Sequence, residues 1–234
     1  MIEAIRSSSA RVIRALSAMD DREARQPSAL PGWTRAHVVG HLIQSGDAYL
    51  WLMAVARDGV EPWPRAERAA MARELEDLAA RPVAELVDGL ADRMDRLVRV
   101  SEVMPVERWD TLVQALAGWR HPAWYILRRC LRELETHHLD LDVGYRTDDW
   151  PAPYVAWALE DTLSTLAARG FPLARVEAVD LERSWALSDA GPVVSGPGHA
   201  VLGWLSGRRG GAGLSAQELP AAPAWPMPPT PGWG

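Results

Sequence analysis

Apolar residues recur about every 3.6 positions through most of the first 150 residues, which is the period of amphipathic helices. In the stretch 2–19, Ile5, Val12 and Leu16 fall on one side and arginines on the other. Further helices are predicted over residues 35–57, 65–80 and 82–97, and from Pro122 onward. The stretch 109–118 is predicted to be irregular or to hold one short element. Because the connections are short, we predict that residues 1–150 form an antiparallel helical bundle.

Residues with capping or helix-breaking preferences mark the ends of these helices. Asp20 and Asp21 are predicted to end the first helix. A Pro-Gly-Trp turn then precedes Thr34, whose hydroxyl can cap the first turn of the second helix. Asp58 and Gly59, followed by two prolines, are predicted to close that helix.

The pattern changes after residue 150. One more helix is predicted over residues 154–169, ended by Gly170. Two short alternating runs, residues 174–182 and 183–189, indicate paired strands, and a third run leads into a short helix near residue 200. We therefore predict a small α/β domain over residues 151–234. Its last sixteen residues hold six prolines and two tryptophans, which predicts an extended tail laid over the body by its tryptophans.

Composition and charge exclude several classes of protein. All 25 basic residues are arginine, the net charge is −6, and no arginine-rich block stands apart from acidic neighbours, so a nucleic-acid partner is not expected. Charged residues interrupt the apolar positions of the N-terminal stretch, so neither a signal peptide nor a membrane span is expected there. Cys130 is the single cysteine and fits a reducing compartment. We predict a cytoplasmic protein, either a monomer or a homodimer.

A carboxylate and an imidazole lie four residues apart in the helix predicted after Pro122. On a helix, Glu133 and His137 would project from one face about one turn apart, a spacing suited to metal ligands. His41, in the long apolar second helix, is the best candidate for a third donor. Three protein ligands from two facing helices fit a catalytic zinc site, although a two-histidine, one-carboxylate set also suits iron, nickel or manganese.

Each candidate also has a plainer interpretation. His37 and His41 are four residues apart, and either could be a neutral core histidine. His138 points about 100° away from His137 and is predicted to lie at the rim of the site. Cys130 suits a small buried hydrophobe better than a nucleophile or a fourth ligand. Asp140 could orient a ligand histidine, accept a substrate proton, or simply cap the helix end.

Three segments carry a resemblance to a known family: LPGWTRAHVVGHL at residues 30–42, RELETHHLDL at 132–141 and VVSGPGHAVLGWLSGRRGG at 193–211. Together they resemble the mycothiol-dependent maleylpyruvate isomerases, which belong to the DinB-like metal-binding bundles. The resemblance implies a DinB-like four-helix bundle followed by a small α/β domain. It also implies zinc bound by His41, Glu133 and His137, with catalytic roles for Asp140 and Arg208.

The resemblance implies a function as well. Zinc would favour the thiolate of mycothiol, and that thiolate would add to the double bond of maleylpyruvate or a related unsaturated acid, allow rotation, and leave again. Arg208 or Arg209 would bind the carboxylates of the substrate. The family often has an arginine where this chain has Cys130, which leaves Arg128 or Arg129 as stand-ins or marks a different substrate. The alternatives are a mycothiol S-transferase and a non-catalytic metal-binding module.

Overall fold

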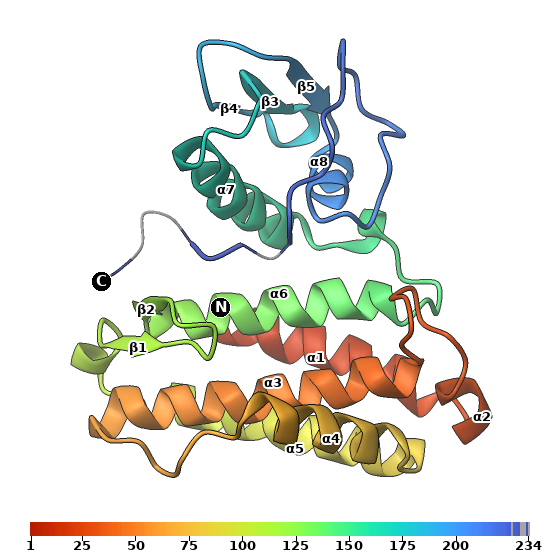
Figure 1. Ribbon diagram of the computed structural model, residues 1–234, viewed down its shortest axis with the longest axis vertical. Helices are drawn as coiled ribbons and strands as arrows, with labels where there is room; N and C mark the ends of the chain where they lie inside the picture. Colours follow the sequence, from red (N-terminus) through yellow and green to blue (C-terminus); the bar gives the residue numbers. More distant parts are fainter. Residues whose placement is uncertain (226, 230–232, 234) are drawn as a thin grey trace. The chain divides into compact units, whose positions relative to one another are not determined.

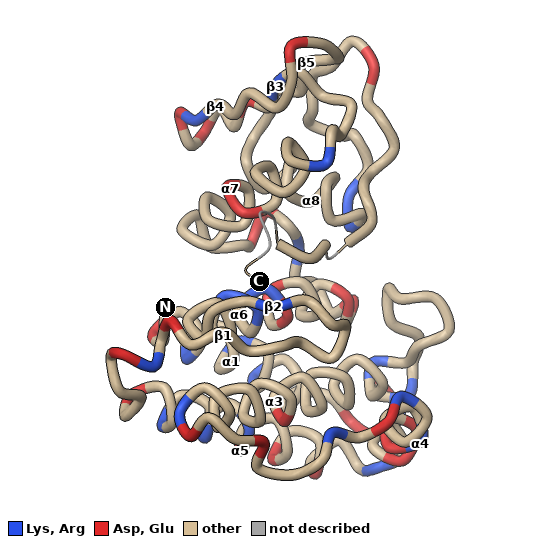
Figure 2. The backbone as a smooth tube through the Cα atoms, turned by 60° about the vertical axis from the view of Figure 1, so that its left-hand side comes forward, with Lys and Arg blue, Asp and Glu red and all other residues tan. Residues whose placement is uncertain are grey.

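Four long helices form the body of the N-terminal unit (Figure 1). The computed structural model describes residues 1–225, 227–229 and 233. Helix α3 packs against α5 and α6, and α1 packs against the same two helices. Their bounds are α1 Ile2–Ser17, α3 Arg35–Asp58, α5 Val83–Glu102 and α6 Trp124–Asp140. The predicted bundle is therefore present, and α4 (Arg68–Ala79), which carries charged residues of both signs (Figure 2), packs on α3.

The apolar stripes that predicted the helices are the surfaces that form this core. Val12 and Leu16 of α1, Leu90 of α5 and Leu134 of α6 are at most 1% exposed. Burial of such side chains removes apolar surface from water, which is the main favourable term in folding. Gly46 lets α3 approach α5 closely, because a Cβ at this position would lie only 2.8 Å from the Cβ of Arg93.

Two short elements of this unit differ from the sequence-based expectation. Asp20 does not only end α1; it caps a further short helix, α2 (Asp21–Ala24), through a capping box with Glu23. The irregular stretch contains a small hairpin of β1 (Leu112–Gln114) and β2 (Arg120–Pro122), preceded by the 3-10 turn Val106–Arg108. The hairpin leads directly into α6.

The hairpin buries a histidine that the sequence did not single out. His121 is fully buried, and its Nδ1 lies 2.8 Å from the carbonyl oxygen of Pro122. Nδ1 therefore carries the proton, and Nε2 accepts a hydrogen bond from Nη1 of Arg129 at 3.2 Å. Burial lowers the pKa of His121 to about 4, although the bond to Pro122 acts in the opposite direction.

This buried histidine predicts a loss of stability in mild acid. Between pH 6.5, its ordinary pKa, and pH 4, the unfolded chain binds a proton at His121 that the folded protein does not. The contribution of neutral His121 to the free energy of unfolding is therefore fully present above the pKa that this group has in the unfolded chain. It is lost as the pH drops toward 4, by about 2 kcal/mol between pH 7 and pH 5. Urea unfolding at both pH values measures this. In His121→Gln the pH dependence should be smaller by that amount, and an equal dependence in both proteins would contradict the assignment.

The second unit is a small α/β arrangement. The chain divides into the compact units Met1–Tyr145 and Arg146–Trp233, whereas the sequence placed the division after residue 150. Helix α7 packs against α8, and a three-stranded sheet has the order β4-β3-β5, with β4 antiparallel and β5 parallel to β3. The elements are the 3-10 turn Thr147–Asp149, α7 Ala152–Ala168, β3 Arg175–Ala178, the 3-10 turn Val179–Leu181, β4 Arg183–Ala186, β5 Val193–Gly196 and α8 Gly198–Leu205.

The proline-rich end has no helix or strand among its described residues. Trp225 and Trp233 are half-buried there, and the part of the predicted tail at residues 226, 230–232 and 234 lies outside the described residues. Within the described chain, no helix has both the length and the apolar character needed to cross a membrane.

Candidate metal centre

Helices α3 and α6 bring three potential metal ligands together. The capping box of Thr34 and His37 fixes the start of α3, and His41 lies one turn after His37. Glu133 and His137 lie one turn apart on the face of α6 that meets α3. Figure 1 shows the two helices side by side along the bundle.

The donor atoms of these three side chains converge. Oε2 of Glu133 lies 3.0 Å from Nε2 of His41 and 3.2 Å from Nε2 of His137. The centres of the two imidazole rings are 4.7 Å apart and the ring planes are nearly perpendicular, and the Nε2 atom of each ring lies near the same carboxylate oxygen. All three donor atoms fall within 4.8 Å of one another, and all three residues are partly shielded from solvent. Two imidazole nitrogens and one carboxylate oxygen are a donor set that fits zinc and other divalent metals.

The protonation of this trio depends on its mutual contacts. Burial raises the pKa of Glu133, but hydrogen bonds and charge interactions with His137 and His41 outweigh burial and hold this pKa well below its usual value. Burial lowers the pKa of His137, but its contacts with Asp140 and Glu133 outweigh burial and raise the pKa to about 9. The carboxylate is therefore ionised. Because the pKa of His137 is about 9, its ring is protonated near neutral pH, and a bound dication would have to displace the proton on Nε2.

Asp140 lies behind His137. Its Oδ2 is 2.9 Å from Nδ1 of His137, and the Asp140 residue is 1% exposed. The carboxylate holds the proton on Nδ1 and leaves Nε2 directed at Glu133. This is the arrangement in which a metal-binding histidine is fixed in one tautomer and one orientation.

Loss of this contact should weaken the metal site without destroying it. In Asp140→Asn the amide oxygen can still accept a hydrogen bond from Nδ1–H of His137, but the negative charge that favours this orientation is gone. Affinity for zinc is expected to fall about 10- to 100-fold, the usual effect of removing such a partner. Competition with a chelating dye measures the affinity. An affinity equal to that of the parent would contradict a supporting role for Asp140.

The other candidate residues lie apart from the trio. His37 is used by the cap of α3 and its Nε2 lies 3.2 Å from Glu76. His138 was predicted to lie at the rim, which is wrong: it is 6% exposed, and its ring stacks on Tyr145 at 3.8 Å with an interplanar angle of 9°. It is buried because α6 turns this face toward the chain that follows it.

Cys130 behaves as a small apolar residue. It is 1% exposed, and its Sγ lies 3.8 Å from Sδ of Met94 in the bundle core. Burial, and to a lesser extent the charge of Glu133, raises the pKa of the thiol far above its usual range. A thiol of this kind is a poor nucleophile and a poor ligand, which favours the buried-hydrophobe interpretation.

The two arginines predicted to act on the substrate lie in the second unit. Nη1 of Arg209 donates to Oδ1 of Asp148 at 2.6 Å and to Oγ1 of Thr147 at 3.1 Å. Nη1 of Arg208 donates to the carbonyl oxygen of Ser206 at 2.8 Å. Arg209 is therefore held within its own unit by a carboxylate, and a catalytic role for Arg208 stays a prediction.

Comparison with known proteins places this chain in a family. The sequence model of the mycothiol maleylpyruvate isomerase N-terminal domain matches residues 5–142, more than half of the chain and the part that carries all three donors. The chain belongs to the mycothiol maleylpyruvate isomerase family. A comparison with curated proteins gave no match.

Solved structures bear out the fold of this family member over almost its whole length. A crystal structure of the mycothiol-dependent maleylpyruvate isomerase matches with a TM-score of 0.84 and 23% identity, covering 96% of this chain and 95% of that one. A variant of that enzyme with one histidine replaced by alanine matches with the same TM-score and coverage and 22% identity. The predicted DinB-like bundle with a small α/β unit is thereby confirmed.

Proposed function

We propose that this protein is a metal- and thiol-dependent isomerase that converts the cis double bond of maleylpyruvate, or of a related unsaturated acid, to the trans form, with mycothiol as cosubstrate. The observation that carries the proposal is the convergence of His41, Glu133 and His137 within 4.8 Å in a member of this family. We infer zinc as the metal and a small acidic molecule and a low-molecular-weight thiol as the partners.

In this proposal His41, Glu133 and His137 would hold the metal, and Asp140 would keep a proton on Nδ1 of His137 so that Nε2 could serve as the ligand atom. A dication at this point favours the thiolate form of a nearby thiol at neutral pH. The thiolate sulfur forms a bond to one carbon of the double bond, and the π electron pair moves onto the conjugated carbonyl oxygen as an enolate. The former double bond is then a single bond and rotates. Elimination restores the double bond as the trans isomer and returns the thiolate, so no atom is gained or lost. Arg208 is assigned to a substrate carboxylate.

Product analysis tests this reaction against its alternatives. Zinc-loaded protein is incubated with mycothiol and maleylpyruvate, and the products are followed by NMR. Formation of fumarylpyruvate with constant mycothiol supports the isomerase. A stable thioether that consumes mycothiol would instead indicate an S-transferase, and no turnover of either kind would favour a non-catalytic metal-binding module.

We prefer the isomerase to the S-transferase because Cys130, the residue that suggested an S-transferase, has another explanation. Cys130 replaces an arginine of the family, and it fills a buried position beside Met94. A cytoplasmic location, inferred from the single cysteine, belongs to the same proposal. Whether the enzyme acts as a monomer or as a homodimer is a question for sedimentation analysis.

A further inference from the structure

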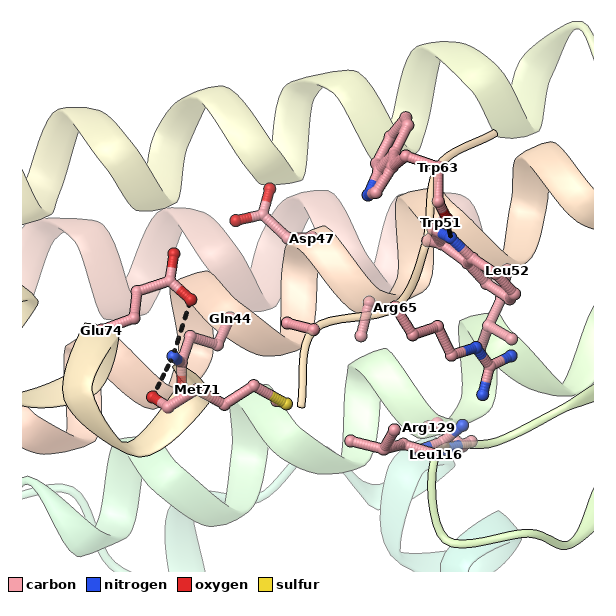
Figure 3. A pocket seen from close by; sticks show the side chains of 12 residues that line it. Gln44, Asp47, Trp51, Leu52, Trp63, Arg65, Met71, Glu74, Leu116 and Arg129 are labelled. Atoms are coloured by element: carbon pink, nitrogen blue, oxygen red, sulfur yellow. Dashed lines mark hydrogen bonds between the residues drawn. The ribbon is translucent and has the colours of Figure 1, made fainter. Parts of the chain in front are cut away.

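A pocket of about 330 Å³ begins one helical turn from the candidate metal ligands (Figure 3). On α3, Gln44 lies three residues after His41 and lines the pocket. On α6, Arg129 lies four residues before Glu133 and lines it too. Residues at these spacings share one helix face, so both helices lead from the metal ligands into the same pocket. The remaining wall comes from the segment after α3, from α4 and from the hairpin.

Two arginines lie at one end of this pocket. Figure 3 shows Arg65 and Arg129 at that end and Gln44 and Glu74 at the other. Arg65 comes from the segment between α3 and α4, and its guanidinium carbon lies 3.9 Å from the ring centre of Trp51. It also donates a hydrogen bond to the carbonyl oxygen of Gln114.

Arg129 is held more firmly still. Its guanidinium carbon lies 4.7 Å from the ring centre of Trp119 and 5.3 Å from that of Tyr49. Its Nη1 donates to Nε2 of the neutral His121. Stacking on aromatic rings and a neutral acceptor fix the direction of the guanidinium without neutralising its charge.

Neither arginine forms an ion pair with a carboxylate among the described residues. Two acidic residues line the other parts of the pocket, and each has its own partner: Asp47 accepts from Nε of Arg93 at 3.1 Å, and Glu74 accepts from Nε2 of Gln44 at 3.1 Å. Partial burial lowers the pKa of Arg65, against the opposing effect of the charge of Glu61. Two cations that are partly removed from water and lack an anion are a site for one.

We propose that Arg65 and Arg129 form an anion-binding subsite that holds a carboxylate of the substrate, while the carbon chain of the substrate runs from there past Gln44 toward the metal centre. The planar guanidinium groups suit a carboxylate, because each can donate two parallel hydrogen bonds to it. The role of this subsite in binding a substrate carboxylate rests on the proposed function. The subsite defines the substrate class as an unsaturated acid with a carboxylate at the end of the molecule remote from the metal centre.

Equilibrium binding tests the subsite without turnover. Fumarylpyruvate, which carries two carboxylates, is titrated calorimetrically into zinc-loaded protein in the absence of thiol. Arg129→Gln and Arg65→Gln are each expected to weaken binding about 10- to 100-fold, the range for losing a hydrogen bond between charged groups. Arg129→Lys, which keeps the charge and loses the fork, should fall between Arg129→Gln and the parent.

The matched control is Arg14→Gln, which makes the same change of charge on an exposed position of α1. Its affinity should equal that of the parent, and thermal unfolding verifies that all variants are folded. If folded Arg65→Gln and Arg129→Gln proteins bind fumarylpyruvate like the parent, the subsite is wrong even where isomerisation occurs. If both weaken binding but no isomerisation occurs, the subsite stands and the proposed reaction fails.

Discussion

Glu133→Gln is expected to abolish high-affinity metal binding, with at least a hundredfold loss of zinc affinity. Glu133 lies between His41 and His137 and, among the residues that the structure describes, supplies the only negative charge in direct contact with both. The amide therefore removes the strongest attraction for a dication while keeping the shape. Since loss of a supporting partner alone costs up to about a hundredfold, loss of a ligand should cost more. Competition with a chelating dye gives the affinity.

Thermal unfolding with and without zinc gives a second readout. Bound metal stabilises the folded protein by about 2.7 kcal/mol at a hundredfold excess over its dissociation constant, so zinc should raise the melting temperature of the parent. It should leave those of Glu133→Gln, His41→Ala and His137→Ala nearly unchanged. His37→Ala is the matched control, because it removes a histidine one turn from His41 that lies outside the trio. Parent-like zinc binding in all three ligand variants would contradict the site.

Glu135→Ala is expected to cost about 3 kcal/mol of folding stability. Glu135 is fully buried, its Oε1 accepts a hydrogen bond from Arg11 of α1, and its Oε2 accepts one from the hydroxyl of Tyr145 at 2.6 Å. Truncation to alanine removes the carboxylate from both partners. The partly buried guanidinium of Arg11 is then left without its counter-ion, and removal of one partner of a shielded ion pair strongly destabilises the folded state. Urea unfolding in the parent and the variant measures the difference.

Glu85→Ala provides the comparison, because this exposed glutamate of α5 should change stability by no more than about 0.5 kcal/mol. A loss in Glu135→Ala as small as that in Glu85→Ala would show that the α1–α6 contact does not depend on this carboxylate. Glu133 and Glu135 lie two residues apart on α6 and face different neighbours. Replacement of the first should therefore affect metal binding, and replacement of the second should affect stability.

The sequence predicted the long elements well because their limits carry local chemical signals. Helix α3 begins after the capping hydroxyl of Thr34 and ends at Gly59, whose φ of 76° suits glycine. The short elements were harder. Helix α2 has only four residues, and its one signal is the capping pair Asp20 and Glu23. The β1–β2 hairpin has strands of three residues, too short for an alternating pattern to stand out.

In the candidate site too, positions on one helix could be predicted from the sequence, whereas contacts between separate elements could not. Spacing on one helix identified Glu133 and His137, whereas His41 was chosen over His37 by resemblance, and the structure places His41 beside them. The burial of His138 against Tyr145 and the contact between His121 and Arg129 depend on how the segments that flank α6 fold back on that helix. Arg65 was predicted to begin the helix over residues 65–80, but α4 begins at Arg68 and Arg65 lies in the irregular segment before it. Nothing in the sequence connected Arg65 with Arg129.

The central claim is that isomerisation depends on the metal centre of His41, Glu133 and His137 together with a thiol. The most direct measurement is the initial rate of fumarylpyruvate formation from maleylpyruvate under four conditions: zinc-loaded protein with mycothiol, the same without mycothiol, chelator-treated protein with mycothiol, and that protein after zinc is restored. We predict formation only in the first and the last. An unchanged rate after removal of either the metal or the thiol would contradict the account.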